Sequence, residues 1–122
     1  LNDFYIEEDI AFTHGEKDFL ELYDKQIKTI VTSHVHPAVL ICDKINIKRE
    51  KYKCFLVGKY KKKQFIIVPS FFSITEGTEI SEYKKGESYQ QLIPKNKLKS
   101  FETYVVGRDD VYHFGKYGKL IG

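Results

Sequence analysis

The sequence has no methionine and no tryptophan, and only two of its 122 residues are cysteines. Because methionine is absent, we expect a chain that was processed or that forms part of a longer protein. No apolar run approaches the roughly 20 residues that cross a bilayer as a helix, and no secretory signal opens the sequence. These absences argue against a membrane partner, and we predict a cytoplasmic location.

The two cysteines, Cys42 and Cys54, have neither the spacing nor the number of a structural zinc site. We interpret them as reduced thiols, with a bridge between neighbouring strands as the alternative. Arginine is also scarce, since Arg49 and Arg108 are the only two in a chain of net charge +3. Nucleic-acid readers rely on the arginine fork, so this scarcity argues against a dedicated DNA-reading module.

What the chain does contain is the composition of a folded globular protein, with 42% apolar and 30% charged residues. Its length suits one unit better than two. We therefore treat residues 1–122 as a single unit.

The first third of the chain predicts a strand, a helix and a second strand. Ile10–Thr13 and Thr29–Thr32 are short apolar and β-branched runs. Between them, Asp18–Lys28 repeats apolar residues at helical spacing, with Asp18 as the expected N-cap. A unit of this kind joins parallel strands by a crossover, so the pattern predicts an α/β fold with a mixed sheet.

The rest of the chain is predicted to be rich in β-structure. A hairpin is expected around Lys61–Lys63, with all three lysines in a solvated turn. Pro69–Thr78 is a loop long enough to suggest a role, and Ser88–Leu92 suggests a short helical turn. The expected strands of this part are Ala38–Cys42, Tyr52–Tyr60, Gln64–Val68, Thr103–Val106, Val111–Phe114 and Lys119–Ile121.

Three of the four histidines stand where predicted strands end. His14 follows the first strand of the crossover unit, and His34 and His36 follow the second. The carboxyl ends of parallel strands share one edge of a sheet, so we expect these imidazoles to lie close together. Histidine is the commonest ligand of transition metals, and the spacing therefore predicts a metal site. His113 is interpreted as a structural residue.

Carboxylates are scarce around these histidines, since Glu16 is the only acidic residue within two positions of any of them. Three neutral imidazoles alone suit a zinc site like that of carbonic anhydrase. A two-metal hydrolase would need carboxylate ligands from elsewhere. A stand-alone three-histidine zinc protein therefore remains open.

A small non-enzymatic binding domain is the other alternative. Tyrosines in the predicted strand Tyr52–Tyr60 can stack on bases, and the neighbouring lysines can contact phosphates. These lysines are Lys51, Lys53, Lys59 and Lys61. Such a domain could bind nucleic acid, although the same residues suit an exposed hairpin.

Two segments resemble motifs of a known family. Phe12–Gly15 and Ser33–Ala38 are similar to the H-G and G-H-x-H motifs of calcineurin-like metallophosphoesterases, and most similar to the branch of predicted ICC-like phosphoesterases. The likeness continues along Cys54–Gly58, Ile67–Phe71, Thr75–Thr78, Tyr104–Val106 and Val111–Gly115. It spans nearly the whole chain but only the C-terminal half of the family's domain.

The resemblance implies the C-terminal half of an αββα sandwich and a metal-dependent phosphoesterase. Such an enzyme hydrolyses phosphomonoesters or phosphodiesters, nucleotides and nucleic acids among them, with two ions of manganese, iron or zinc in the complete site. By resemblance, His14 and His34 bind the second metal, and His36 binds the first. Ser33 stands where the family has glycine.

The family's first half carries D-x-H, G-D-x-x-D and G-N-H-D/E motifs, and none of them occurs in this sequence. The resemblance therefore implies that the chain holds no catalytic residue and is inactive alone. It also implies a partner, either the N-terminal half of the same domain or a self-association partner. That partner would cover the apolar surface that half a sandwich leaves exposed.

Overall fold

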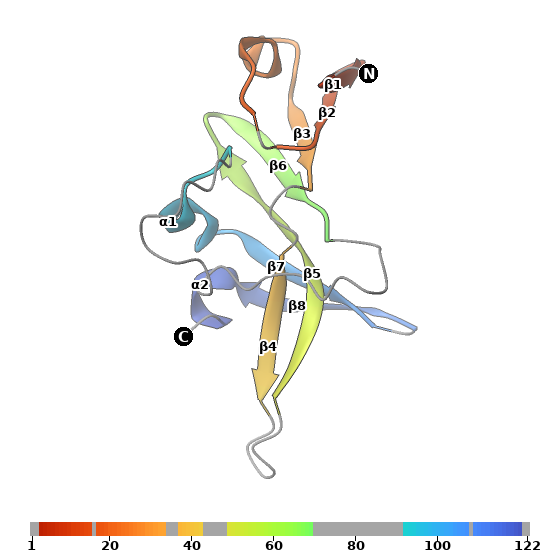
Figure 1. Ribbon diagram of the computed structural model, residues 1–122, viewed down its shortest axis with the longest axis vertical. Helices are drawn as coiled ribbons and strands as arrows, with labels where there is room; N and C mark the ends of the chain where they lie inside the picture. Colours follow the sequence, from red (N-terminus) through yellow and green to blue (C-terminus); the bar gives the residue numbers. More distant parts are fainter. Residues whose placement is uncertain are drawn as a thin grey trace.

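The computed structural model describes residues 3–15, 17–33, 37–42, 49–69, 92–107 and 109–120. Across these ranges the chain forms a mixed sheet of order β1-β2-β3-β6-β5-β7-β8, and β4 pairs with β5 off this path (Figure 1). The strands are β1 (Phe4–Glu7), β2 (Ile10–Thr13), β3 (Thr29–Thr32), β4 (Ala38–Cys42), β5 (Arg49–Tyr60), β6 (Lys63–Ile67), β7 (Glu102–Val106) and β8 (Val111–Lys116). Short helices are η1 (Leu20–Tyr23), α1 (Lys95–Leu98) and α2 (Tyr117–Leu120). The predicted mixed, β-rich sheet is confirmed.

β2 and β3 pair in parallel, as the crossover pattern predicts. The register places Ile10 beside Thr29 and Phe12 beside Val31. β3 in turn pairs in parallel with β6, and the other described strand pairs are antiparallel. Three neighbouring strands therefore end at the same edge of the sheet, where ligand sites of parallel sheets collect.

The connection between β2 and β3 is not the helix predicted over Asp18–Lys28. Only η1 forms there, as a 3-10 turn with Phe19 rather than Asp18 at its N-cap. Leu20, which belongs to the helical apolar pattern, is 89% exposed. The amide of Lys28 donates to the carbonyl of Asp9 at 2.8 Å, whereas in a helix it would bond four residues back. At Lys28 a tertiary hydrogen bond thus replaces the one that a helix would make.

The predicted strand Lys119–Ile121 is also wrong, because α2 occupies most of it. Tyr117 is fully buried, and its hydroxyl donates to the carbonyl of Ala38 at 3.0 Å. The amide of Tyr117 donates to the carbonyl of Phe101 at 2.8 Å. These bonds direct the chain away from the sheet after β8.

Two elements, β1 and α1, were not predicted from the sequence. β1 pairs antiparallel with β2 and places Phe4 opposite Thr13. α1 follows Pro94 and buries Leu98. The predicted loop Pro69–Thr78 and helical turn Ser88–Leu92 lie outside the described residues, except for Pro69 and Leu92.

The three short helices contribute to a core on one face of the sheet. Leu22 of η1, Leu98 of α1 and Tyr117 of α2 belong to one buried cluster. In Figure 1, α1 and α2 lie on the same side of the strands. Phe101 packs so closely over Gly58 of β5 that a Cβ there would lie 2.4 Å from its ring. Side-chain packing therefore requires the glycine at this position.

The opposite face carries a row of apolar side chains that are neighbours across five strands. Tyr5, Phe12, Val31, Ile66 and Val57 form this apolar row. Tyr5 is 57% exposed and Phe12 is 41% exposed, and the other three are half-buried. Among the described residues, helices thus cover one face of the sheet, and the other face carries partly exposed apolar side chains.

The predicted hairpin forms between β5 and β6, but its three lysines do not share a solvated turn. Lys61 and Lys62 make the turn, with φ of 50° and 66°, as a two-residue hairpin loop requires. Lys63 is only 8% exposed. Its ammonium donates to the carbonyls of Asp24, at 2.6 Å, and Ile27. Strand alternation places Lys63 on the helix-covered face, where it binds the connection between β2 and β3.

We expect Lys63→Met to lower the free energy of unfolding by about 2 kcal/mol, because hydrogen bonds from a charged donor are worth about 1.5–3 kcal/mol. The apolar replacement leaves the buried carbonyl of Ile27 without its donor. Lys62→Met, at the exposed turn, is the matched control and should change stability by less than about 0.5 kcal/mol. Urea unfolding of the two variants measures the difference, and equal midpoints would contradict this role.

The alternative of a bridge between the two cysteines is wrong, because Cys54 is a free, buried thiol. β4 pairs Cys42 with Arg49, five residues before Cys54 on β5. Burial raises the pKa of Cys54 to about 12.

This shift predicts a pH dependence. Above its ordinary pKa of 9.0 the thiol ionises in the unfolded chain, whereas in the folded chain it stays protonated up to about 12. The unfolded state then binds fewer protons, so stability should fall as pH rises between these values, by up to about 1.4 kcal/mol per pH unit. Comparing the unfolding of the natural chain with Cys54→Ala from pH 8 to 11 isolates this contribution. The same slope in both proteins would show that Cys54 does not cause it.

Candidate metal centre

The carbonyl of His14 joins the ends of β2 and β3. It accepts the amide of Ser33 at 3.1 Å and the hydroxyl of Thr32 at 2.6 Å. Both donors come from the end of β3, and Thr32 is 4% exposed. His14 therefore lies beside Ser33, the residue that directly precedes His34 in the sequence.

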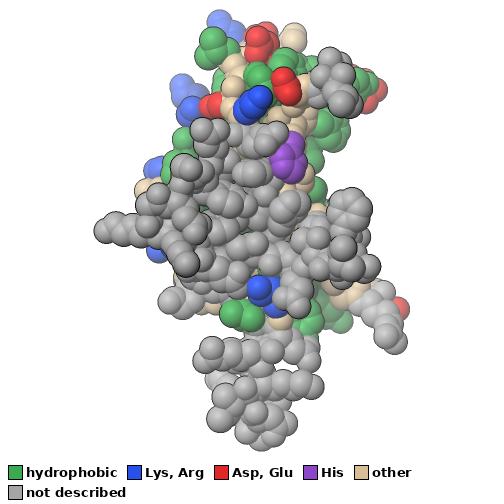
Figure 2. Space-filling model, viewed as in Figure 1, with side chains coloured by type: hydrophobic (Ala, Val, Ile, Leu, Met, Phe, Trp, Pro, Cys, Tyr) green, Lys and Arg blue, Asp and Glu red, His purple; other side chains and the backbone are tan. Residues whose placement is uncertain are grey.

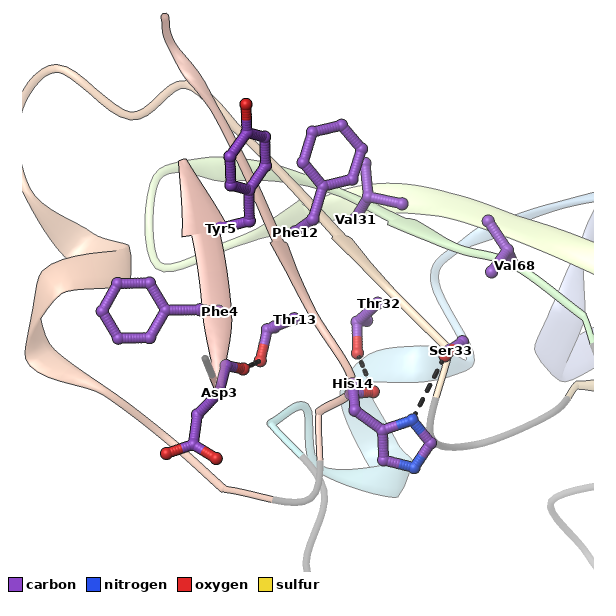
Figure 3. Close-up of a pocket in the computed structure, with 10 residues that line it drawn as sticks. All are labelled: Asp3, Phe4, Tyr5, Phe12, Thr13, His14, Val31, Thr32, Ser33 and Val68. Carbon is purple, nitrogen blue, oxygen red and sulfur yellow. Dashed lines mark hydrogen bonds between the residues drawn. The ribbon is translucent and has the colours of Figure 1, made fainter. Parts of the chain in front are cut away.

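The side chain of His14 lies next to the same serine. Its Nδ1 is 3.4 Å from Ser33 Oγ, as the dashed line in Figure 3 shows. Ser33 is not among the described non-glycine residues of positive φ, so this position does not require the glycine that the family has. Its β-carbon is accommodated, and its hydroxyl is added to the surroundings of His14.

His14 lines an open hollow of about 530 Å³ at the shared edge of the strands. Tyr5, Phe12, Val31 and Val68 line its apolar side, and Thr13 and Thr32 lie between them and His14 (Figure 3). Val68 belongs here because its amide donates to the carbonyl of Thr32 at 2.8 Å, which extends the pairing of β3 with the chain beyond β6. The hollow thus has an aromatic side and an imidazole side.

Asp3 also lines this hollow, and sequence reasoning missed it. The antiparallel register of β1 and β2 ends with Phe4 opposite Thr13, so Asp3 and His14 follow at the same end of the pair. The backbone carbonyl of Asp3 accepts a hydrogen bond from the hydroxyl of Thr13 at 3.1 Å, and this bond does not involve the Asp3 carboxylate. No pattern in Phe4–Glu7 predicts this position, because only the pairing of β1 with β2 brings Asp3 to the hollow.

Of the three predicted ligands, the structure places only His14. His34 and His36 lie outside the described residues. Within the described ranges no group of three or more histidine, cysteine, aspartate or glutamate side chains could hold a metal. Imidazole nitrogen and carboxylate oxygen, as His14 and Asp3 offer them, are donors that zinc, iron and manganese accept. The donor types fit such an ion.

His113 lies on β8, apart from this site. β8 and β2 are separated in the sheet by β3, β6, β5 and β7, so five strand spacings of about 4.8 Å place them roughly 24 Å apart. The ring of His113 stacks on Tyr104 with centroids 4.8 Å apart, and its Nε2 lies 3.4 Å from a carboxylate oxygen of Glu102. Its contacts are therefore those of a cross-strand pair.

The sequence was compared with family models, curated proteins and solved structures, and none of them matches. In the part of the chain that the structure describes, no helix is long and apolar enough to cross a membrane. The comparisons therefore give no support to the resemblance to metallophosphoesterases, which stays a prediction.

We expect Mn²⁺ added to the chain to broaden the NMR signals of Thr13, His14 and Ser33, because a paramagnetic ion bound by His14 lies next to them. In His14→Ala, at least ten times more Mn²⁺ should be needed for the same broadening, because loss of one imidazole removes a direct ligand. His113→Ala, on the far edge of the sheet, is the matched control and should leave it unchanged. If His113→Ala reduced the broadening and His14→Ala did not, the metal would bind at another site.

Proposed function

We propose that this chain supplies the histidine ligands of a metal-dependent phosphoesterase that hydrolyses phosphomonoesters or phosphodiesters at a two-metal centre. In this proposal His14, His34 and His36 are ligands, and the fold belongs to the C-terminal half of an αββα sandwich. The complete site would hold two ions of manganese, iron or zinc. The substrate is a phosphoester, and nucleotides and nucleic acids are included in that class.

The observation that carries the proposal is the parallel pairing of β2 and β3. It brings His14 to the residue immediately before His34, with the carbonyl of His14 bonded to Thr32 and Ser33. These residues are 18 and 19 positions from His14 in the sequence. In this proposal the imidazole of His34, which follows Ser33 in the sequence, would share an ion with that of His14 through ligand bonds of about 2 Å.

In such a site the two ions would supply Lewis-acid neutralisation of the charge that develops during displacement at phosphorus. The chain's own contribution would be to hold imidazoles at a strand edge beside an open hollow. The backbone of His14 is bonded to β3, so its imidazole starts from a defined position. The aromatic side of the hollow, with Tyr5 and Phe12, would border the bound substrate.

The carboxylates that a two-metal site needs are not supplied by the described chain beyond Asp3. We propose that they come from a partner, either the N-terminal half of the same domain or a self-association partner. The apolar row supports this, because Tyr5 and Phe12 are exposed on a sheet face that adjoins the hollow. A second sheet packed on this face would bury the row and bring its own ligands to the same edge.

A cytoplasmic location is also part of the proposal.

The nucleic-acid alternative is less well supported. Lys61 lies over the rings of Tyr23 and Tyr60, 4.8 and 5.6 Å from their centroids, and Lys51 and Lys53 are half-buried. In Figure 2, acidic and basic side chains mix at the end of the molecule that carries β1 and β2. Binding of phosphates favours clustered positive charge, and the described side chains at this end of the face in Figure 2 do not provide it. The stand-alone zinc protein needs the same three histidines, so the assay below distinguishes it.

We expect the chain alone, with Mn²⁺, to show no hydrolysis of bis-p-nitrophenyl phosphate or p-nitrophenyl phosphate above a metal blank. The complete product of its gene should hydrolyse at least one of them. Activity of that protein should fall by at least 100-fold in His34→Ala, because a ligand of the centre is lost.

His113→Ala in the complete protein is the control and should keep normal turnover. Robust turnover by the chain alone, abolished by His34→Ala, would show that no partner carboxylates are needed. Zinc binding by the chain with no phosphoesterase activity in the complete protein would favour the stand-alone zinc protein.

A further inference from the structure

We propose that Ser33 is a positioning residue that holds the imidazole of His14 in its Nδ1–H tautomer and so directs Nε2 toward a bound metal. The inference depends on the proposed role of His14 as a ligand. It concerns the one motif position at which this sequence carries serine where the family it resembles has glycine.

The hydroxyl of Ser33 reaches the ring because the backbones on both sides are fixed. The amide of Ser33 donates to the carbonyl of His14 at 3.1 Å, and the hydroxyl of Thr32 donates to the same oxygen at 2.6 Å. Thr32 is almost fully buried, so this end of β3 has little freedom. Ser33 Oγ then lies 3.4 Å from Nδ1 of His14 (Figure 3).

The chemistry of the pair favours one direction for this hydrogen bond. A hydroxyl has two lone pairs and can accept from a ring N–H. A neutral imidazole carries a proton on only one nitrogen, so a proton on Nδ1 leaves the lone pair on Nε2. Ligating histidines commonly donate their other ring N–H to an acceptor, which fixes the tautomer and the ring orientation. Glycine at position 33 could not provide that acceptor.

The first experiment needs no metal. Nitrogen-15 shifts of the His14 ring, recorded in the metal-free chain, distinguish the two tautomers. We expect the Nδ1–H form to predominate in the natural chain, and Ser33→Ala and Ser33→Gly to move the ring to the Nε2–H form. Ser33→Thr keeps the hydroxyl and should retain the Nδ1–H form.

Ser100→Ala is the matched control, because it removes a serine hydroxyl that donates to the carbonyl of Lys97 in α1. It should leave the His14 signals unchanged. Amide spectra and thermal unfolding of each variant establish that it is folded. Should Ser33→Ala not fold, Ser33→Gly and Ser33→Thr still give the comparison.

The second experiment is titration of the same proteins with Zn²⁺. Loss of an outer hydrogen bond to a ligand typically weakens metal binding about 10- to 100-fold, so we expect at least a tenfold weaker affinity for Ser33→Ala and Ser33→Gly. Ser33→Thr should restore the affinity of the natural chain. Ser100→Ala should match the natural chain.

The outcomes separate the two proposals. A tautomer unaffected by Ser33→Ala and Ser33→Gly overturns the positioning role, even if Zn²⁺ binds at His14. A tautomer that follows the hydroxyl, in a chain whose Zn²⁺ binding does not depend on His14, supports the hydrogen bond and contradicts the metal function. A change in both readouts, reversed by threonine, supports the positioning role.

Discussion

Two hydrogen bonds to the carbonyl of His14 hold the ends of β2 and β3 together, and the geometry of the candidate site depends on them. They come from Thr32 and Ser33, the last residue of β3 and the one after it. Parallel strands end at one edge, so this contact brings a histidine and the start of the second histidine motif to the same place. An antiparallel pairing of the same strands would have placed them at opposite edges.

The two faces of the sheet have different physical requirements. One face is buried under η1, α1 and α2, and the buried ammonium of Lys63 binds the carbonyls of the connection that contains η1. The other face carries the apolar row, in which Tyr5 and Phe12 remain exposed. Large exposed apolar patches mark interaction surfaces, and this one adjoins His14. Partner and metal ligands are therefore expected on the same side of the sheet.

The candidate site is a partial donor set on a well-defined scaffold. His14 and Asp3 lie at one end of an open hollow, and neighbouring hydroxyls from Thr13, Thr32 and Ser33 surround them. Imidazoles alone can bind a metal, but displacement at phosphorus between two ions needs carboxylates to hold both. The serine at position 33 adds a hydroxyl 3.4 Å from Nδ1 of His14, whereas the motif that this sequence resembles has glycine there.

Local pattern alone predicted most of the strands and the hairpin between β5 and β6. Ile10–Thr13, Thr29–Thr32 and Ala38–Cys42 form with the predicted bounds, because β-branched and apolar runs ended by polar residues have few other ways to be buried. Their spacing also predicted the parallel pair that ends at His14, since a short connection between two such runs favours a crossover.

Tertiary contacts decided what the pattern could not show. In the segment Asp18–Lys28, the amide of Lys28 donates to the carbonyl of Asp9, and the carbonyl of Asp24 accepts from Lys63, so a helix does not form. Tyr117 is buried and bonded to Ala38, and α2 forms where a strand was predicted. Asp3 reached the hollow only through the register of β1 against β2. Hydrogen bonds across the molecule, and contacts between side chains at a strand edge, depend on partners that are distant in sequence. Local periodicity cannot indicate those partners.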